Sequence, residues 1–274
     1  MRQLHPPDMP SHFPTTLSPK PDLPKLEIRN VTKVFGRGNR KDKQILTAVD
    51  CVSFQLASNE FSCIVGPSGC GKSTLLNIAA GLMPATSGEI LVDGEAVPGP
   101  GADRGMVFQN YTLFAWLSVA DNVAFGLKLK GVPKAERKER VGYYLDIVGL
   151  SRWAKAYPKA LSGGMKQRVA IARALANDPA VLLMDEPFGA LDSQTKEQLQ
   201  AFFHDLWAKT QITVLMITHD VDEAIFLSQR IFVMNIHGQL KETIAIGLPQ
   251  HRELDMKLTT EFLTYKREII HLLR

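Results

Sequence analysis

The sequence predicts an α/β fold around a mainly parallel sheet. In the second half of the chain, short apolar runs without polar breaks alternate with helix-like segments, as at 181–184 and 212–217. Strands of this kind are typical of parallel sheets that helices cover on both faces. A glycine-rich stretch also joins an apolar strand, Phe61–Val65, to a helix-like segment over 75–80. With 274 residues, 45% of them hydrophobic, the chain can bury a sizeable core.

The beginning of the chain is expected to hold a tail and two strands. Residues 1–24 are rich in proline and poor in apolar periodicity, which predicts a flexible tail. Residues 26–31 alternate apolar and polar side chains as a half-buried strand does, and residues 48–56 do so in part. The basic segment 37–43 is then interpreted as a solvated loop between these two strands.

The glycine-rich stretch after Phe61–Val65 predicts a binding site for a polyphosphate. Glycines let the backbone wrap closely around an anion, so that N–H groups and the N-terminus of the next helix point inward. Lys72 is expected to reach the β- and γ-phosphates, and Ser73 to place its hydroxyl on Mg²⁺. A plain glycine turn is the alternative, but it would not need lysine and serine at these two positions. The predicted nucleotide-binding residues here are Gly66, Pro67, Ser68, Gly69, Cys70, Gly71, Lys72, Ser73 and Thr74.

The middle of the chain mixes two further strands with a helical section. Short strands are expected over 88–94, which glycines bound, and over 105–109. A helix is expected over 118–130, because Ser118 is a good N-cap residue. A second helix is expected over 133–148, where a proline suits the first helical turn.

Helices are also expected over 163–177 and 194–209, between the apolar strands of the second half. The end of the chain carries apolar residues spaced three and four apart, which predicts one stripe of an amphipathic helix. The residues of this stripe are Leu258, Phe262, Tyr265, Ile269 and Leu272. Packing of the stripe against its own domain is favoured over a contact with another subunit.

Polar side chains follow three of the predicted strands. Asp185 and Glu186 come directly after 181–184, where ligands of parallel sheets usually bind. Asp185 is expected to join Ser73 around Mg²⁺, and Glu186 to polarise a water that attacks a γ-phosphate. An acidic pair can also merely end a strand. His219, after 212–217, could donate a hydrogen bond to a γ-phosphate oxygen or to that water, and the amide of Gln109 could contact the metal or the water.

A second anion-binding site is predicted where the helix over 163–177 begins. Ser162, Gly163 and Gly164 supply a hydroxyl and two glycines at that point. An ordinary N-cap after a flexible turn is the alternative interpretation.

Bulk properties exclude several classes of protein. The net charge of +4 comes from 32 basic and 28 acidic residues that are dispersed along the chain, so nucleic-acid binding is not indicated. Three cysteines, Cys51, Cys63 and Cys70, are odd in number and lack metal-ligand spacing, which argues against a disulfide framework or a zinc site. No apolar run is long enough to span a bilayer, and the N-terminus does not read as a signal peptide, so a soluble, cytoplasmic chain is expected.

The combination of these motifs resembles the nucleotide-binding subunits of ABC transporters. The motifs that carry the resemblance, in the family's order, are the phosphate loop 66–74, Gln109, the signature 161–165, Asp185 with Glu186, the turn 189–192, and His219. The resemblance implies a P-loop NTPase of the ABC ATPase type, with an antiparallel β subdomain and a helical subdomain over about 110–165. The ATP-binding domain would then cover 25–249, and a C-terminal amphipathic helix 250–274.

The resemblance also implies a division of labour between two copies of the chain. In the family, two subunits pack head to tail, and each ATP lies between the phosphate loop of one and the signature of the other. Ser162, Gly163 and Gly164 would then contact the γ-phosphate held by the partner's Lys72, and Asp192 would couple the two sites. The aromatic that stacks on adenine would be Phe35, where the family usually has tyrosine. ATP and Mg²⁺ are the implied ligands, and the chain alone is expected to be a poor ATPase.

Within the family, the signature with Met165 and the turn 187–192 look like those of importer subunits for nitrate, sulfonates and taurine. The implied function is hydrolysis of ATP to drive import, at the cytoplasmic face of the inner membrane. The implied partners are a second copy, transmembrane permease subunits and, indirectly, a solute-binding protein. The segment 111–117, which holds Tyr111, Phe114 and Trp116, would help to form the groove for a coupling helix of the permease. Alternatively, these rings anchor the helical section to the core.

Two other functions remain open at this stage. One is a soluble ABC ATPase that acts on nucleic acid or ribosomes, although such proteins usually join two ATPase domains or insert an extra module, and neither is visible in the sequence. The other is the ATPase subunit of an exporter, which often carries its membrane helices on the same polypeptide. No internal repeat and no membrane helix is predicted here.

Overall fold

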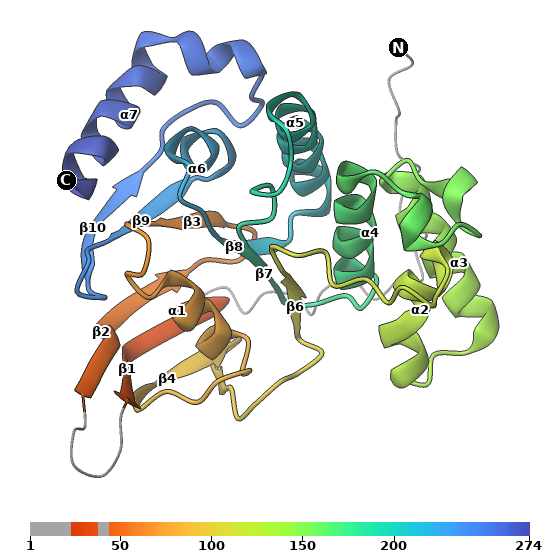
Figure 1. The fold of residues 1–274 in the computed structure, drawn as a ribbon, viewed down its shortest axis with the longest axis horizontal. Coiled ribbons are helices and arrows are strands. Elements are labelled where there is room, and N and C mark those ends of the chain that lie inside the picture. The colour runs from red at the N-terminus through yellow and green to blue at the C-terminus, as the bar shows by residue number, and fades with distance from the viewer. Residues whose placement is uncertain (1–22, 38–43) are drawn as a thin grey trace.

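The computed structural model describes residues 23–37 and 44–274, which form two sheets and several groups of helices (Figure 1). The predicted tail up to residue 22 and the basic loop over 38–43 lie outside the described residues.

The first sheet is antiparallel and has the strand order β2-β1-β4-β5. Its strands are β1 (Leu26–Arg37), β2 (Gln44–Leu56), β4 (Ser87–Val92) and β5 (Glu95–Ala96). The first two strands are longer than their alternating segments predicted, because β1 and β2 continue to pair beyond them. This sheet lies on one side of α1 and faces the second sheet across it (Figure 1).

The second sheet has the order β10-β9-β3-β8-β7-β6, and only β10 is antiparallel to its neighbour. Its strands are β3 (Phe61–Val65), β6 (Arg104–Val107), β7 (Val181–Asp185), β8 (Thr213–Ile217), β9 (Arg230–Met234) and β10 (Leu240–Ala245). The mainly parallel sheet is therefore confirmed, whereas β9 and β10 were not predicted from the sequence. The apolar run Ile231–Val233 was the available signal for β9.

Most helices begin and end near the expected residues, but the helix over 221–227 was not predicted, and the last helix begins at Thr260, inside the expected segment 250–274. The α-helices are α1 (Lys72–Ala79), α2 (Val119–Leu129), α3 (Lys134–Ile147), α4 (Gly163–Leu175), α5 (Ser193–Thr210), α6 (Val221–Leu227) and α7 (Thr260–Leu273). Short 3-10 helices are η1 (Ser151–Trp153), η2 (Pro158–Ala160) and η3 (Leu254–Leu258). Ser118 caps α2 as predicted, because its hydroxyl accepts a hydrogen bond from the Asp121 amide. Pro133 is the N-cap of α3 rather than a residue of its first turn.

Three apolar clusters hold these elements together. One lies between the two sheets, where α1 inserts Leu75 and Leu76. A second lies on the other face of the parallel sheet, under α5, α6 and α7. The third joins α2, α3 and α4. Helix α4 belongs to both of the last two clusters, with Ile171 against the sheet and Val169 against α2 and α3. The helical section therefore has an apolar core of its own.

Helix α7 packs against the sheet cluster, as the favoured interpretation of the apolar stripe expected. Phe262 and Ile269 are fully buried there, and Tyr265 and Leu272 contact the same cluster. The prediction was wrong for Leu258, which does not belong to the buried stripe. Leu258 is 80% exposed and lies in η3, before the helix begins. The turn at Thr259, which caps α7, breaks the helical spacing that would have aligned Leu258 with the stripe.

We expect Phe262→Ala to lower the free energy of unfolding by about 3–5 kcal/mol, because removing a fully buried ring leaves a cavity under α7. Leu263→Ala on the exposed side of the same helix is the matched control, with an expected change within about 0.5 kcal/mol. Urea unfolding followed by circular dichroism measures both changes. Equal effects of the two substitutions would contradict the docking of α7.

Candidate active site

The predicted site residues gather at one edge of the parallel sheet. The strands β3, β8, β7 and β6 are neighbours in that order and run parallel, so their C-terminal ends meet at the same edge. The phosphate loop follows β3, Asp185 ends β7 and Glu186 follows it, and His219 lies two residues beyond β8. Gln109 lies two residues beyond β6. This edge is where ligands of open α/β sheets bind.

The phosphate loop needs glycine at its point of entry into α1. Gly71 is the N-cap of α1 and has φ of 96°, in the left-handed region. A Cβ atom at this position would lie 1.9 Å from the carbonyl oxygen of Ala48 on β2. Backbone conformation and the close approach of a neighbouring strand therefore both require glycine. Helix α1 begins at Lys72, earlier than expected, which places Ser73 and Thr74 in its first turn.

The side chain of Lys72 folds back onto the loop that it follows. Its ammonium group donates to the carbonyl oxygens of Gly66 at 2.8 Å and Pro67 at 2.9 Å, and the Cys70 sulfur lies 3.8 Å from it. The side chain is buried, and these carbonyls replace the water that the ammonium has lost. The ammonium is thereby held inside the loop, at the N-terminal end of α1.

Ser73 and Asp185 face each other across the site. The Ser73 hydroxyl donates to Oδ1 of Asp185 at 3.3 Å. Burial raises the pKa of Asp185, the neighbouring charge of Glu186 raises it further, and the Ser73 hydrogen bond and Lys72 oppose the shift. This carboxylate is therefore short of positive charge, and a cation would stabilise it.

The oxygen atoms of Ser73 and Asp185 fit Mg²⁺, which prefers hard oxygen ligands and is usually held by one or two carboxylates together with substrate phosphates. No group of three or more histidine, cysteine, aspartate or glutamate side chains among the described residues could hold a metal by itself.

Side chains that follow three strands come together at the carboxylate of Glu186. Its Oε2 lies 2.9 Å from Nδ1 of His219 and accepts a hydrogen bond from Nε2 of Gln109 at 3.4 Å. The backbone N–H of Glu186 donates to the carbonyl of Ile217 at 3.0 Å, which fixes the turn after β7 against β8. Glu186 has φ of 42°, a strained conformation for a non-glycine residue that is common at functional sites.

The signature residues lie elsewhere in the chain, at the start of α4 (Figure 1). The Ser162 hydroxyl caps α4 by accepting from the Met165 amide at 3.3 Å. A Cβ on Gly163 would lie 2.8 Å from the Tyr111 hydroxyl oxygen, and one on Gly164 would lie 2.8 Å from the Thr195 methyl carbon. The signature thus contacts both the loop after Gln109 and the start of α5, whereas a single chain does not bring it to the phosphate loop on α1.

Two further predicted site residues, Asp192 and Phe35, lie at a helix start and on a strand. Asp192 is the N-cap of α5, where its carboxylate accepts from the Thr195 amide at 3.0 Å; this hydrogen bond lowers the pKa of Asp192. Phe35 lies on β1 opposite Leu46, with the Lys33 ammonium 5.2 Å from the centroid of its ring. Leu46 is an exposed apolar side chain, so the predicted adenine-stacking position has one exposed apolar neighbour and one cationic neighbour.

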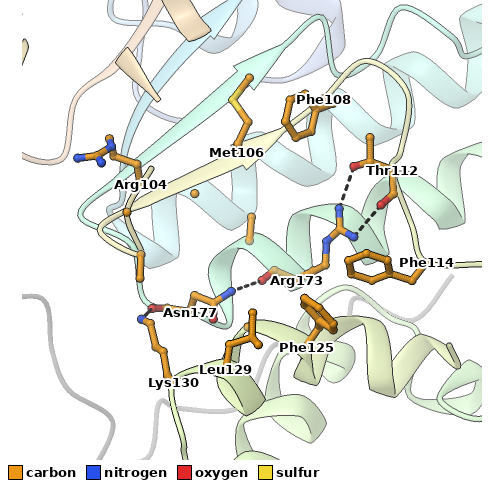
Figure 2. Close-up of a pocket in the computed structure, with 15 residues that line it drawn as sticks. Arg104, Met106, Phe108, Thr112, Phe114, Phe125, Leu129, Lys130, Arg173 and Asn177 are labelled. Atoms are coloured by element: carbon orange, nitrogen blue, oxygen red, sulfur yellow. Dashed lines mark hydrogen bonds between the residues drawn. The ribbon is translucent and has the colours of Figure 1, made fainter. Parts of the chain in front are cut away.

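A cavity of about 590 Å³ opens between β6, α2 and α4 (Figure 2). Apolar side chains dominate its lining, among them Met106, Phe108, Phe114, Phe125 and Leu129. Trp116 lies beside it, with its ring 5.5 Å from that of Phe114 and its side chain 74% exposed. Within the aromatic segment, Phe114 packs against Phe125 while Trp116 faces outward, and the groove for a coupling helix stays a prediction.

Arg173 on α4 holds the segment after Gln109 in place and was not predicted from the sequence. Its guanidinium donates to the Thr112 carbonyl at 2.8 Å and to the Thr112 hydroxyl at 3.0 Å, and it lies over the ring of Phe114 (Figure 2). Burial lowers the pKa of Arg173. The helix that begins with the signature is thus joined directly to the loop that follows Gln109.

Comparison with known proteins agrees with this arrangement. The profile of the ABC transporter family matches residues 49–189. The nitrate import ATP-binding protein NrtD of Synechocystis sp. is 51% identical over 91% of this chain and 95% of its own length. The taurine import ATP-binding protein TauB of Roseobacter denitrificans is 44% identical over 90% and 93%. The aliphatic sulfonates import ATP-binding protein SsuB of Bacillus cereus is 42% identical over 89% and 94%.

Among solved structures, the dimeric ATP-binding cassette MJ0796 in a post-hydrolysis state with ADP and Pi superimposes with a TM-score of 0.70. It is 34% identical in sequence and matches over 82% of this chain and 100% of its own. In the part of the chain that the structure describes, no helix is both long and apolar enough to cross a membrane.

We expect Asp185→Asn to raise the melting temperature of the nucleotide-free chain at neutral pH. Folding raises the pKa of this carboxyl group, so the ionised form destabilises the folded chain. The loss of stability is complete above the pKa of the folded state, and it disappears as the pH falls to the pKa of the unfolded state. The amide removes this charge. Scanning fluorimetry between pH 4 and 8 should show the gain shrinking at low pH, whereas Asp205→Asn on the exposed side of α5 should change little. A lower melting temperature for Asp185→Asn at neutral pH would contradict the shift.

Proposed function

The chain belongs to the ABC transporter family and is an ATP-binding ATPase, and we propose that it powers an importer of small anionic or organic solutes. The observation that carries the mechanism is the convergence of Gln109 and His219 on the Glu186 carboxylate, beside the Ser73–Asp185 pair. A hydrolytic water, a metal ion and a γ-phosphate would all be within reach of groups at this edge of the sheet.

Binding of ATP would use the loop before α1. The backbone N–H groups of 66–74 and the N-terminus of α1 would surround the phosphates. Lys72 would exchange the carbonyls of Gly66 and Pro67 for phosphate oxygens, which are charged and therefore stronger acceptors. Ser73 and Asp185 would hold Mg²⁺, which neutralises charge on the phosphates when it is bound.

Hydrolysis would begin with a water held by Glu186. The Glu186 carboxylate would take a proton from this water while the water oxygen bonds to the γ-phosphorus, and the bond from that phosphorus to the β–γ bridging oxygen would break. An ionised Glu186 can only accept hydrogen bonds, so Nδ1 of His219 carries the hydrogen and donates to it. Nε2 of the neutral ring is then an acceptor that suits an O–H group of the water, and a protonated ring would instead donate to a γ-phosphate oxygen.

A second copy of the chain would complete each site. The related cassette MJ0796 is dimeric, which supports a homodimer here. Within one chain the start of α4 lies apart from α1, and head-to-tail pairing would bring Ser162, Gly163 and Gly164 of one copy to the γ-phosphate bound by the other. Asp192 would lie at the interface. A monomeric chain should therefore hydrolyse ATP slowly.

Permease subunits are proposed to dock beside the cavity between α2 and α4. Trp116 and Leu129 are 74% and 76% exposed there, and large exposed apolar side chains mark contact surfaces. Because Arg173 joins this region to the loop after Gln109, a change at the γ-phosphate would reach the docked segment. This arrangement would hold the chain at the cytoplasmic face of the membrane as a peripheral subunit, with a solute-binding protein acting on the far side of the permease.

The importer is favoured over the other functions because several relatives are named for import. They are named for nitrate, taurine and aliphatic sulfonates, all small oxyanions or carriers of a sulfonate group. We propose a solute of this class. Neither a soluble ATPase that acts on nucleic acid or ribosomes nor an exporter subunit is favoured.

We expect Glu186→Gln to lower kcat by at least about 100-fold, because the amide keeps the hydrogen-bonding shape but cannot take the proton. ATP should still bind, and gel filtration should show a dimer that persists with ATP. Glu197→Gln on the exposed surface of α5 is the control and should retain normal turnover. Near-normal turnover of Glu186→Gln would remove Glu186 from the role of base.

We expect Trp116→Ala to weaken association with the permease by roughly 30-fold, which corresponds to the loss of an interface hot spot. ATP affinity should stay within about twofold, since Trp116 does not touch the phosphate loop. Trp153→Ala, which removes a 41%-exposed tryptophan from η1, is the control. Co-purification from detergent and fluorescent-nucleotide titration measure the two properties, and parallel loss of both would count against docking at Trp116.

A further inference from the structure

A buried group of charged and polar side chains lies between α5 and α6, directly behind the turn that carries His219. The Lys196 ammonium on α5 lies 2.7 Å from Oδ2 of Asp220 and 3.5 Å from Oε1 of Glu223. The Glu223 side chain is only 2% exposed, and its Oε1 also accepts from the Gln200 amide at 2.9 Å. The Asp220 side chain is partly exposed, and the cation between the two carboxylates stabilises both, because two unpaired negative charges would repel each other.

Asp220 connects this group to His219 through the main chain. Asp220 is the next residue in the chain and is also the N-cap of α6, where its Oδ1 accepts from the Glu223 amide at 3.1 Å. The backbone N–H of Asp220 donates to the hydroxyl of Thr218, and that of Thr218 donates to the carbonyl of Ile64 on β3. The Asp220 side chain is therefore bound on one oxygen by α6 and on the other by α5, and His219 lies between two fixed residues.

The other end of the ion pair leads to the turn before α5. Lys196 lies in the first turn of α5, and its backbone N–H donates to the carbonyl of Asp192 at 2.9 Å. Asp192 caps the same turn through its side chain. One residue thus connects the turn at Asp192, through a main-chain hydrogen bond and then a side-chain ion pair, to the turn at His219.

Charge balance holds the ion pair together. Burial alone would lower the pKa of Lys196, but Glu223 and Asp220 outweigh it and raise the pKa, so the ammonium stays charged at neutral pH. Burial would raise the pKa of Asp220, but Lys196 and the cap hydrogen bonds outweigh it and lower the pKa. Both partners are thus ionised in the same pH range, which favours the observed geometry.

We propose that Lys196 is a positioning residue for hydrolysis, which holds His219 against Glu186 by its ion pair with Asp220 and ties that position to the turn at Asp192. This inference rests on the proposed contact of His219 with the γ-phosphate or its water. The Lys196 ammonium pairs with Asp220 and Glu223 and not with the groups proposed to hold the nucleotide, so its effect on the reaction passes through the imidazole. In this proposal the ion pair maintains the distance of 2.9 Å between Nδ1 of His219 and the Glu186 carboxylate.

The test compares steady-state ATP hydrolysis by the full chain, assembled with its permease, in four single variants. Lys196→Met should lower kcat about tenfold with KM for ATP within about twofold, because displacement of a catalytic group affects the reaction step more than ground-state binding. Lys196→Arg should recover most of the rate, since a guanidinium can pair with the same carboxylates. Asp220→Asn should match Lys196→Met, because asparagine keeps the helix cap but loses the charge. Lys266→Met removes the ion pair of Lys266 with Asp222 on the same α6 and should leave kcat unchanged.

A second measurement separates positioning from general stability. In a His219→Ala background, Lys196→Met should cause no further loss of the single-turnover rate, because the group through which it acts is gone. A further tenfold loss in that background, or wild-type kcat for both Lys196→Met and Asp220→Asn, would overturn the inference. If Lys196→Met fails to fold, Asp220→Asn carries the same comparison. Near-normal turnover of His219→Ala alone would instead overturn the proposed role of His219.

Discussion

The parallel pairing of β7 with β8 is the constraint on which the site depends. In this register Asp185 lies opposite Ile217, and the Glu186 amide donates to the Ile217 carbonyl just beyond the last pair. The Thr218 amide makes the equivalent bond to Ile64 on β3. These bonds fix the turns that carry Glu186 and His219 next to the strand that leads into the phosphate loop. A shift of one residue in any of these strands would turn its side chains to the opposite face. It would separate Glu186, His219 and the phosphate loop from one another.

The charges at the same edge of the sheet favour binding of a magnesium–nucleotide complex. Asp185 and Glu186 are adjacent carboxylates, and burial already raises the pKa of Asp185. Lys72 lies near them but is bound by the carbonyls of its own loop. A magnesium–nucleotide complex would bring a cation to Asp185 and stronger acceptors to Lys72, so binding would stabilise both side chains.

The sequence predicted the parts of the structure that depend on local pattern. Apolar runs located β3, β7 and β8, and the serine at 118 located the start of α2. Motif spacing predicted that Ser73, Asp185 and Glu186 lie together. The structure brings them to one edge of the sheet, because Asp185 and Glu186 follow a strand that runs parallel to the one leading into the phosphate loop. Strand β10 was missed because only one of its residues is buried, so it lacks an apolar run.

Two contacts could not be predicted because they join residues that are distant in the sequence. Lys196 and Arg173 read as ordinary basic residues on helical surfaces, and only the packing of α5 on α6 and of α4 on the loop after Gln109 reveals their partners. Of these two contacts, that of Arg173 joins the helical section to the loop after Gln109, whereas that of Lys196 joins α5 to α6. The helical section has its own apolar core, and α4 shares residues with the core under the sheet. A change at the start of α4 would therefore reach the loop after Gln109 through Arg173, and under the proposed role of Lys196 it would also reach the turn that carries His219 through Thr195 and the first turn of α5.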